Sequence, residues 1–201
     1  MGILCGDHPD IRTFIQAKED PDEFTNFNLS VAVTDRFMKA VKTGGKIPMI
    51  NPKTGKSVRE EDASDLFDLM ALTAWKTGDP GLLFVDEVNR KNPTPSIGWM
   101  EGTNPCGELP LYPFESCNLG SINLSHMVQN GRVDYRKLKR IIGIGVRFLD
   151  NIIDINRYPF SRIKRMTLSN RKIGLGIMGW ADMLIQLGLP YDSDAGRAYA
   201  A

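Results

Sequence analysis

Three side chains of different chemistry alternate along residues 104–108. Asn104, Cys106 and Glu108 supply an amide, a thiol and a carboxylate at every second position. If this segment is extended, residues two apart project to the same side of the backbone. The three side chains would then face one pocket and provide a hydrogen-bonding group, a sulfur reactant and a base. The pattern therefore predicts a small active site.

Each of these residues also has a structural interpretation. A lone cysteine is most often a small buried apolar residue, which would explain Cys106 without any reactivity. Glu108 would then be a solvated surface carboxylate, and Asn104 a turn residue ahead of Pro105. The close spacing of the three side chains favours the functional interpretation.

The longer sequence NPCGELPLYPFESCNLGSINL, which begins at Asn104, resembles the catalytic segment of ribonucleotide reductases. The resemblance is strongest to the class II enzymes, which depend on adenosylcobalamin. The NPCGE and SCNLGSIN runs are the most specific parts. Supporting stretches of the same family, in the same order, are residues 1–4 with 7–11, 26–41, 78–95 and 170–192.

The resemblance implies a fold and an activity. The fold would be α/β, with residues 1–201 forming part of the ten-stranded barrel as a partial catalytic domain that lacks its N- and C-terminal parts. The full enzyme would reduce ribonucleotides to 2′-deoxyribonucleotides for DNA synthesis, and this fragment alone is expected to be inactive. The alternative within the family is a class I large subunit, in which a separate radical-carrying subunit replaces cobalamin.

The resemblance also assigns roles to site residues. Cys106 would carry a transient thiyl radical that takes the 3′-hydrogen of the substrate. Glu108 would accept the 3′-hydroxyl proton, and Asn104 would bind the ribose hydroxyls. Cys117 would form a redox-active disulfide with an upstream cysteine outside this chain, and a thioredoxin-type dithiol would reduce it. A disulfide between Cys106 and Cys117 is disfavoured because it would consume the radical cysteine.

Other features of the resemblance remain open. Cys5 has no counterpart in the family pattern and receives no role. The substrate is a diphosphate or a triphosphate, and a homodimer is compatible with the resemblance. Allosteric regulation is not decided by these residues.

A glycine motif suggests a different class of enzyme. Gly174, Gly176 and Gly179 match G-x-G-x-x-G, the fingerprint of a dinucleotide site when it joins a strand to a helix. An NAD-dependent dehydrogenase is therefore the alternative function. No second βαβ unit follows the motif, so close packing between a strand and a helix is the favoured interpretation.

Composition limits the remaining possibilities. Apolar residues make up 42% of the 201 residues, charged residues make up 24%, and the net charge is +1. These values are ordinary for a globular protein and do not suggest nucleic-acid binding. We find neither a run of about 20 apolar residues that would span a membrane nor a signal peptide at the N-terminus. Three cysteines favour a reducing, cytoplasmic environment, and the two scattered histidines suggest no metal site.

The periodicity of apolar residues predicts alternating strands and helices, as in an α/β fold. The segment 46–56 is polar and rich in turn-forming residues, which indicates a loop or hairpin. Helix 134–155 should present a broad apolar face. The expected strands are 28–33, 82–85 and 172–177, and the expected helices are the segment from residue 34 or 35 to Gly44, 63–77, 134–155 and 180–187.

Overall fold

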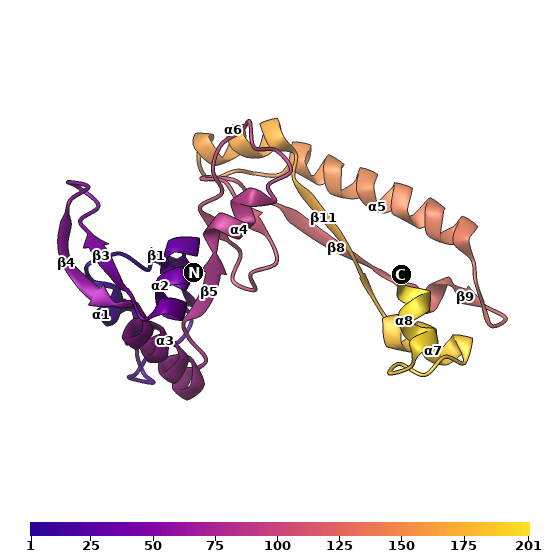
Figure 1. The fold of residues 1–201 in the computed structure, drawn as a ribbon. Helices are drawn as coiled ribbons and strands as arrows, with labels where there is room; N and C mark the ends of the chain where they lie inside the picture. Colours follow the sequence, from indigo (N-terminus) through magenta and orange to yellow (C-terminus); the bar gives the residue numbers. More distant parts are fainter. The chain divides into compact units, whose positions relative to one another are not determined.

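The computed structural model describes residues 1–201, and the chain divides into two compact units. Unit 1 comprises Met1–Pro113 and unit 2 comprises Phe114–Ala201. Each unit is built from both helices and strands (Figure 1). The predicted α/β class is therefore confirmed, and each unit is described separately below.

A three-stranded parallel sheet forms the centre of unit 1. Its strands are β1 (Gly2–Cys5), β2 (Leu29–Val33) and β5 (Gly81–Phe84), in the order β1-β2-β5. All five residues of β2 are buried, as expected for the middle strand of a parallel sheet with apolar side chains. The helices of this unit are α1 (Ile11–Ile15), α2 (Asp35–Thr43), α3 (Ala63–Thr77) and α4 (Val85–Arg90).

Local sequence signals set the ends of these helices. The Thr34 hydroxyl accepts a hydrogen bond from the Phe37 amide and caps α2, which ends at Gly44 with a left-handed φ of 65°. Asp62 caps α3 in the same way, and Gly78 ends that helix. The predicted bounds 63–77 are thus confirmed, because both capping residues are visible in the sequence.

Two antiparallel hairpins complete unit 1. β3 (Lys46–Ile50) pairs with β4 (Ser57–Asp62), so the polar segment predicted as a loop or hairpin is a hairpin. Its buried residues Ile47 and Met49 join the core of the unit, which also contains Ile11, Ile15, Val31, Val33, Phe37, Ala63, Leu66 and Met70. The second hairpin pairs β6 (Gly102–Thr103) with β7 (Pro110–Leu111).

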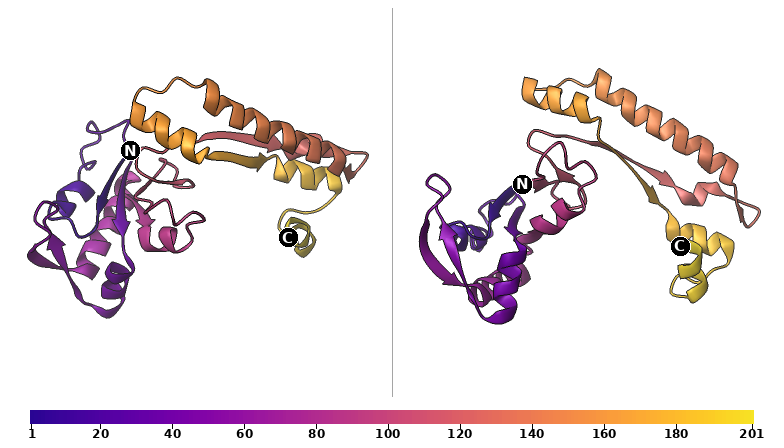
Figure 2. Two further views of the ribbon diagram at one scale, coloured as in Figure 1. Left: turned by 90° about the horizontal axis from the view of Figure 1, so that it is seen from above. Right: turned by 45° about the horizontal axis from the view of Figure 1, so that its top comes forward.

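Unit 2 is organised around a parallel pair of strands and one long helix. β8 (Asn118–Asn123) pairs with β11 (Ile173–Met178), and α5 (Tyr135–Ile155) packs along both strands (Figure 2). The predicted helix 134–155 is confirmed, with Asp134 as its cap. The remaining elements are η1 (Leu124–Met127), β9 (Val128–Gln129), β10 (Arg132–Val133), α6 (Ser161–Asn170), α7 (Trp180–Leu187) and α8 (Asp194–Ala200).

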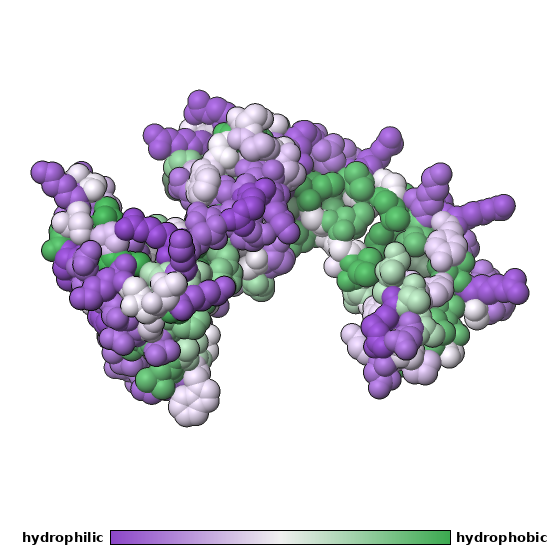
Figure 3. Space-filling model, viewed as in Figure 1, coloured by the Kyte–Doolittle hydropathy of each residue, from purple (hydrophilic) through white to green (hydrophobic).

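The apolar face predicted for α5 is only partly buried. Leu149 and Ile153 are buried, whereas Ile142 and Val146 are each 42% exposed. An apolar area also covers the strands β8 and β11 (Figure 3), where Leu119 is 57% exposed and Ile177 is 63% exposed. No helix combines the length and apolar character needed to cross a membrane.

Candidate active site

Residues 104–109 form the loop that connects β6 to β7, so the segment 104–108 is not extended. The Gly107 amide donates to the Asn104 carbonyl at 3.0 Å, which closes a turn around Pro105 and Cys106. Gly107 has a φ of 84°, a conformation that residues with a Cβ rarely adopt. The side chains of Asn104, Cys106 and Glu108 therefore do not share one side of an extended strand. Proline and glycine in this segment favour a turn instead.

Asn104 stabilises this loop through both its backbone and its side chain. Its Oδ1 atom accepts hydrogen bonds from the Leu109 amide at 3.0 Å and from the Thr103 hydroxyl at 3.2 Å. Its backbone amide donates to the Leu109 carbonyl at 3.3 Å. The interpretation of Asn104 as a turn residue is thus correct, while its side-chain nitrogen is still a donor that could bind a ligand.

The thiol and carboxylate of the motif are both accessible. Cys106 and Glu108 are exposed on the loop, in contrast to the buried cysteine that a purely structural role would predict. Both side chains can therefore reach a molecule bound outside the loop. Their predicted roles, like that of Asn104, require a substrate and remain predictions.

Cys117 lies in unit 2, immediately before β8. Its thiol is half-buried and donates to the Asn118 carbonyl at 3.3 Å. Burial raises the pKa of this thiol, the cation of Lys172 opposes that rise, and the carboxylate of Glu115 adds to it. Cys5, Cys106 and Cys117 are all free thiols in the structure.

The charged neighbours of Cys117 were not identified from the sequence. The Glu115 side chain is fully buried and accepts hydrogen bonds from Lys172 Nζ at 2.6 Å and from Asn170 Nδ2 at 2.8 Å. The sequence offered one signal for this ion pair, namely the charged Glu115 inside the mostly apolar run YPFESC. A carboxylate that is buried with such neighbours needs a partner. The partner itself could not be found without the tertiary structure.

The glycine motif has a packing role in this structure. Gly174 and Gly176 lie within β11 and pair with Leu119 and Ser121 of β8, rather than in a turn that could surround a pyrophosphate. Gly179 caps α7 with a φ of 70°, and a Cβ atom there would lie 2.2 Å from Oδ1 of Asn123. The strand and helix on either side of the motif are as predicted, and the geometry favours close packing over dinucleotide binding.

The α/β architecture and the cysteine-bearing loop are consistent with a known class of enzyme domain. The family model for the barrel domain of ribonucleotide reductase matches residues 1–201. The chain therefore belongs to the ribonucleotide reductase barrel-domain family.

Individual relatives support the same assignment. The chain is 52% identical over 195 residues to a vitamin B12-dependent ribonucleoside-diphosphate reductase of Mycobacterium tuberculosis strain H37Rv, covering 96% of this chain and 28% of that protein. It is 49% identical over 195 residues to the enzyme of the same name from Thermoplasma acidophilum, covering 96% of this chain and 25% of that protein. A ribonucleoside-diphosphate reductase subunit alpha from Chlamydia pneumoniae is 38% identical over 139 residues, covering 67% of this chain and 13% of that subunit. The chain thus spans about a quarter of the length of the B12-dependent relatives.

Proposed function

We propose that the protein containing this chain reduces ribonucleotides to 2′-deoxyribonucleotides by a thiyl-radical mechanism for DNA synthesis. The main support is the family match across residues 1–201, together with the exposed thiol of Cys106 on a loop shaped by Gly107. The names of the relatives with 52% and 49% identity favour the B12-dependent class over the class I alternative. They also favour a ribonucleoside diphosphate as the substrate.

Cys106 would be the residue that exchanges a hydrogen atom with the substrate. In the proposed cycle, its sulfur radical takes the hydrogen atom from C3′ of the ribose and returns one when the product forms. Adenosylcobalamin would supply the organic radical that starts this chemistry. The exposure of Cys106 fits a thiol that must be reached by a bulky cofactor and by a substrate.

Glu108 and Asn104 would act on the ribose hydroxyls. The Glu108 carboxylate would serve as the base that accepts the 3′-hydroxyl proton. The Asn104 amide nitrogen would donate to a ribose oxygen while its Oδ1 atom keeps the loop closed. The loop would thereby carry a hydrogen-bond donor two residues before Cys106 and a base two residues after it.

Cys117 would provide one of the two electrons that reduce C2′. Together with a partner cysteine outside this chain, it would be oxidised to a disulfide while the 2′-hydroxyl leaves as water. A thioredoxin-type dithiol would then reduce this disulfide by exchange and become a disulfide itself. We place this reaction in the cytoplasm, where such dithiols are available, and we expect a homodimer.

The substitution Cys106→Ser in the full-length enzyme tests the proposal. An O–H bond is stronger than an S–H bond, so serine should not carry the radical, and deoxyribonucleotide formation should fall below about 1% of wild type, a loss of more than about 2.7 kcal/mol in transition-state stabilisation. Cys5→Ser is the matched control and should retain activity. Substantial turnover by Cys106→Ser would refute the assignment.

A further inference from the structure

The buried ion pair between Glu115 and Lys172 lies beside the predicted reductant Cys117. The Glu115 side chain is fully buried, and its Oε2 atom is 2.6 Å from Lys172 Nζ. Its other oxygen accepts a hydrogen bond from Asn170 Nδ2 at 2.8 Å. Removing two charges from water is costly, so a pair in this position is weak evidence for stability by itself.

The strand register places Lys172 next to Cys117. Ile173 of β11 pairs with Asn118 of β8 in the parallel sheet. Lys172 directly precedes Ile173, and Cys117 directly precedes Asn118. Neighbouring strands lie about 4.8 Å apart, and paired positions project to the same face. Cys117 and Lys172 therefore occupy adjacent positions on one face.

The face that holds the Cys117 sulfur is confirmed by a separate contact. A Cβ atom added to Gly174 would lie 3.9 Å from Cys117 Sγ, and Gly174 lies two residues after Lys172, which directly precedes β11. Residues two apart on a strand share a face. The Cys117 sulfur thus lies on the face of the β8–β11 pair that carries the Gly174 position, and the Lys172 cation is near enough to oppose the rise in the pKa of this thiol.

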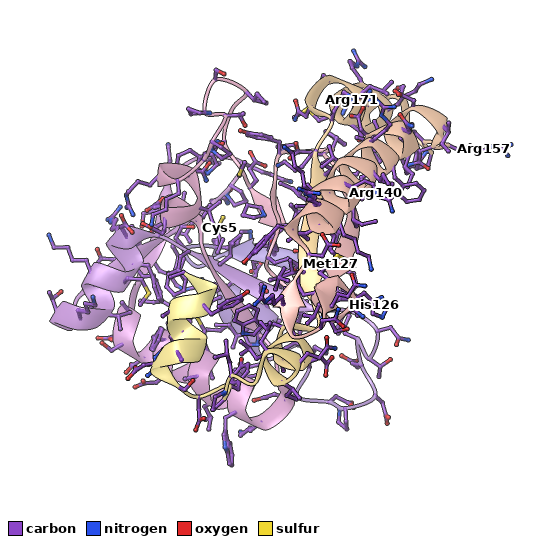
Figure 4. All side chains as sticks on the ribbon, turned by 90° about the vertical axis from the view of Figure 1, so that its right-hand side faces the viewer. Cys5, His126, Met127, Arg140, Arg157 and Arg171 are labelled. Carbon is purple, nitrogen blue, oxygen red and sulfur yellow. The ribbon has the colours of Figure 1, made fainter.

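A second group of charges in unit 2 is paired internally. Arg171, labelled in Figure 4, follows α6. Its guanidinium donates to Asp150 at 2.8 Å and to Asp154 at 2.8 Å on α5. These three charges interact mainly among themselves. Lys172 and Glu115 act on the Cys117 thiol with opposite signs, since the Lys172 cation lowers its pKa and the Glu115 carboxylate raises it.

We propose that the Glu115–Lys172 ion pair is a positioning device, which holds a fixed cation beside the Cys117 sulfur and stabilises its thiolate during disulfide exchange. In that exchange, a thiolate of the external dithiol attacks the sulfur of the partner cysteine and forms a mixed disulfide with it, the original S–S bond breaks, and Cys117 Sγ leaves with the electron pair and is then protonated. A cation beside the departing sulfur speeds this step. Glu115 fixes the position of the Lys172 cation, and its negative charge partly offsets the stabilisation that this cation gives the Cys117 thiolate. The inference rests on the proposed redox role of Cys117.

Site-resolved alkylation of the full-length, reduced protein with iodoacetamide tests this inference. The rate at Cys117 is measured by peptide mass spectrometry over a range of pH, because only the thiolate reacts. Lys172→Met should slow alkylation near neutral pH by about threefold to tenfold, since one pKa unit changes the thiolate fraction about tenfold. Glu115→Gln should accelerate alkylation by a similar factor, because the glutamine carbonyl oxygen can still accept the hydrogen bond from Lys172 Nζ and hold the cation in place, while the negative charge is removed.

The double substitution and two further variants serve as controls. Glu115→Gln combined with Lys172→Met should return the rate toward that of wild type, and Lys172→Arg should preserve it. Lys139→Met removes an exposed cation from α5 and should have no effect. If both single variants change the rate in the same direction, or neither changes it, the pair only packs the protein and the inference is wrong. Alkylation requires no turnover, so this result is separate from the activity of Cys117→Ser, which tests the proposed function.

Discussion

Leu119 lies against the bare backbone of Gly174. The two residues are paired across the parallel strands β8 and β11, and a Cβ atom added to Gly174 would lie 2.4 Å from Leu119 Cδ2. Leu119 is 57% exposed, and its side chain occupies the space that a larger residue at position 174 would need. The absence of a side chain at Gly174 therefore determines where Leu119 lies beside Cys117.

Gly174→Ala should destabilise the protein by about 0.5–1 kcal/mol, because the added methyl group forces the exposed, flexible Leu119 side chain to rotate away. Gly176→Ala is the matched control: its Cβ atom would lie 3.6 Å from Ser121 Oγ, which is an ordinary contact, so its effect should be below about 0.5 kcal/mol. Denaturant unfolding measures both effects. Adding Leu119→Ala to Gly174→Ala should recover part of the loss, and strictly additive effects of these two substitutions would contradict the proposed contact.

Asn104→Asp should separate the two roles of this residue. Aspartate retains an oxygen that accepts from the Leu109 amide, so the loop and the thermal stability should be nearly unchanged. It loses the donor nitrogen, so kcat/KM should fall by about tenfold or more if that nitrogen binds the ribose, equivalent to about 1.4 kcal/mol. Asn104→Ala should lower both stability and activity. Full activity in Asn104→Asp would restrict Asn104 to a structural role.

Cys117→Ser should stop multiple turnover with a dithiol reductant, because serine cannot form a disulfide. Radical formation at Cys106 should remain possible in this variant, since the two thiols act at different steps. Steady-state product formation and an electron paramagnetic resonance measurement of the radical would test the two statements. A variant that cycles at the wild-type rate with thioredoxin would rule out the reductant role.

Stability should decrease in acid through Asp150 and Asp154. Hydrogen bonds from Arg171 lower the pKa of both carboxyl groups, so each binds a proton more weakly in the folded than in the unfolded protein. The two carboxylates therefore contribute to the stability of the fold at any pH above their unfolded pKa near 3.9. This contribution is lost as the pH falls through their lower pKa values in the folded protein. Arg171→Gln should therefore reduce the melting temperature at pH 7 and flatten its decline below about pH 4.

Arg140→Gln is the control for this measurement. Arg140 is an exposed residue of α5, labelled together with Arg171 in Figure 4. Its replacement should leave the dependence of melting temperature on pH unchanged. An unchanged dependence in Arg171→Gln as well would show that other carboxylates cause the acid sensitivity.

Local sequence features determined most of the secondary structure. Thr34 caps α2 and Asp62 caps α3, and Gly44 and Gly78 end these two helices. These interactions involve residues close together in the chain, so the sequence displays both partners. The NPCGE run likewise indicated the family without any knowledge of its conformation.

The tertiary structure decided the features that depend on distant residues. The segment 104–108 is a turn because it closes a hairpin, so Asn104, Cys106 and Glu108 do not alternate on a strand. Register between β8 and β11 brings Lys172 beside Cys117, although 55 residues separate them in the sequence. Pairing of this kind is set by the packing of strands against a shared helix, which periodicity does not reveal.

The glycine motif shows both kinds of information at one place. The sequence by itself determined that a strand leads through Gly174 into a helix that begins near Trp180. Only the structure decided that Gly174 and Gly176 face a neighbouring strand, β8. The same three glycines would suit a phosphate turn or a close contact between elements, and the choice depends on what lies opposite them in space.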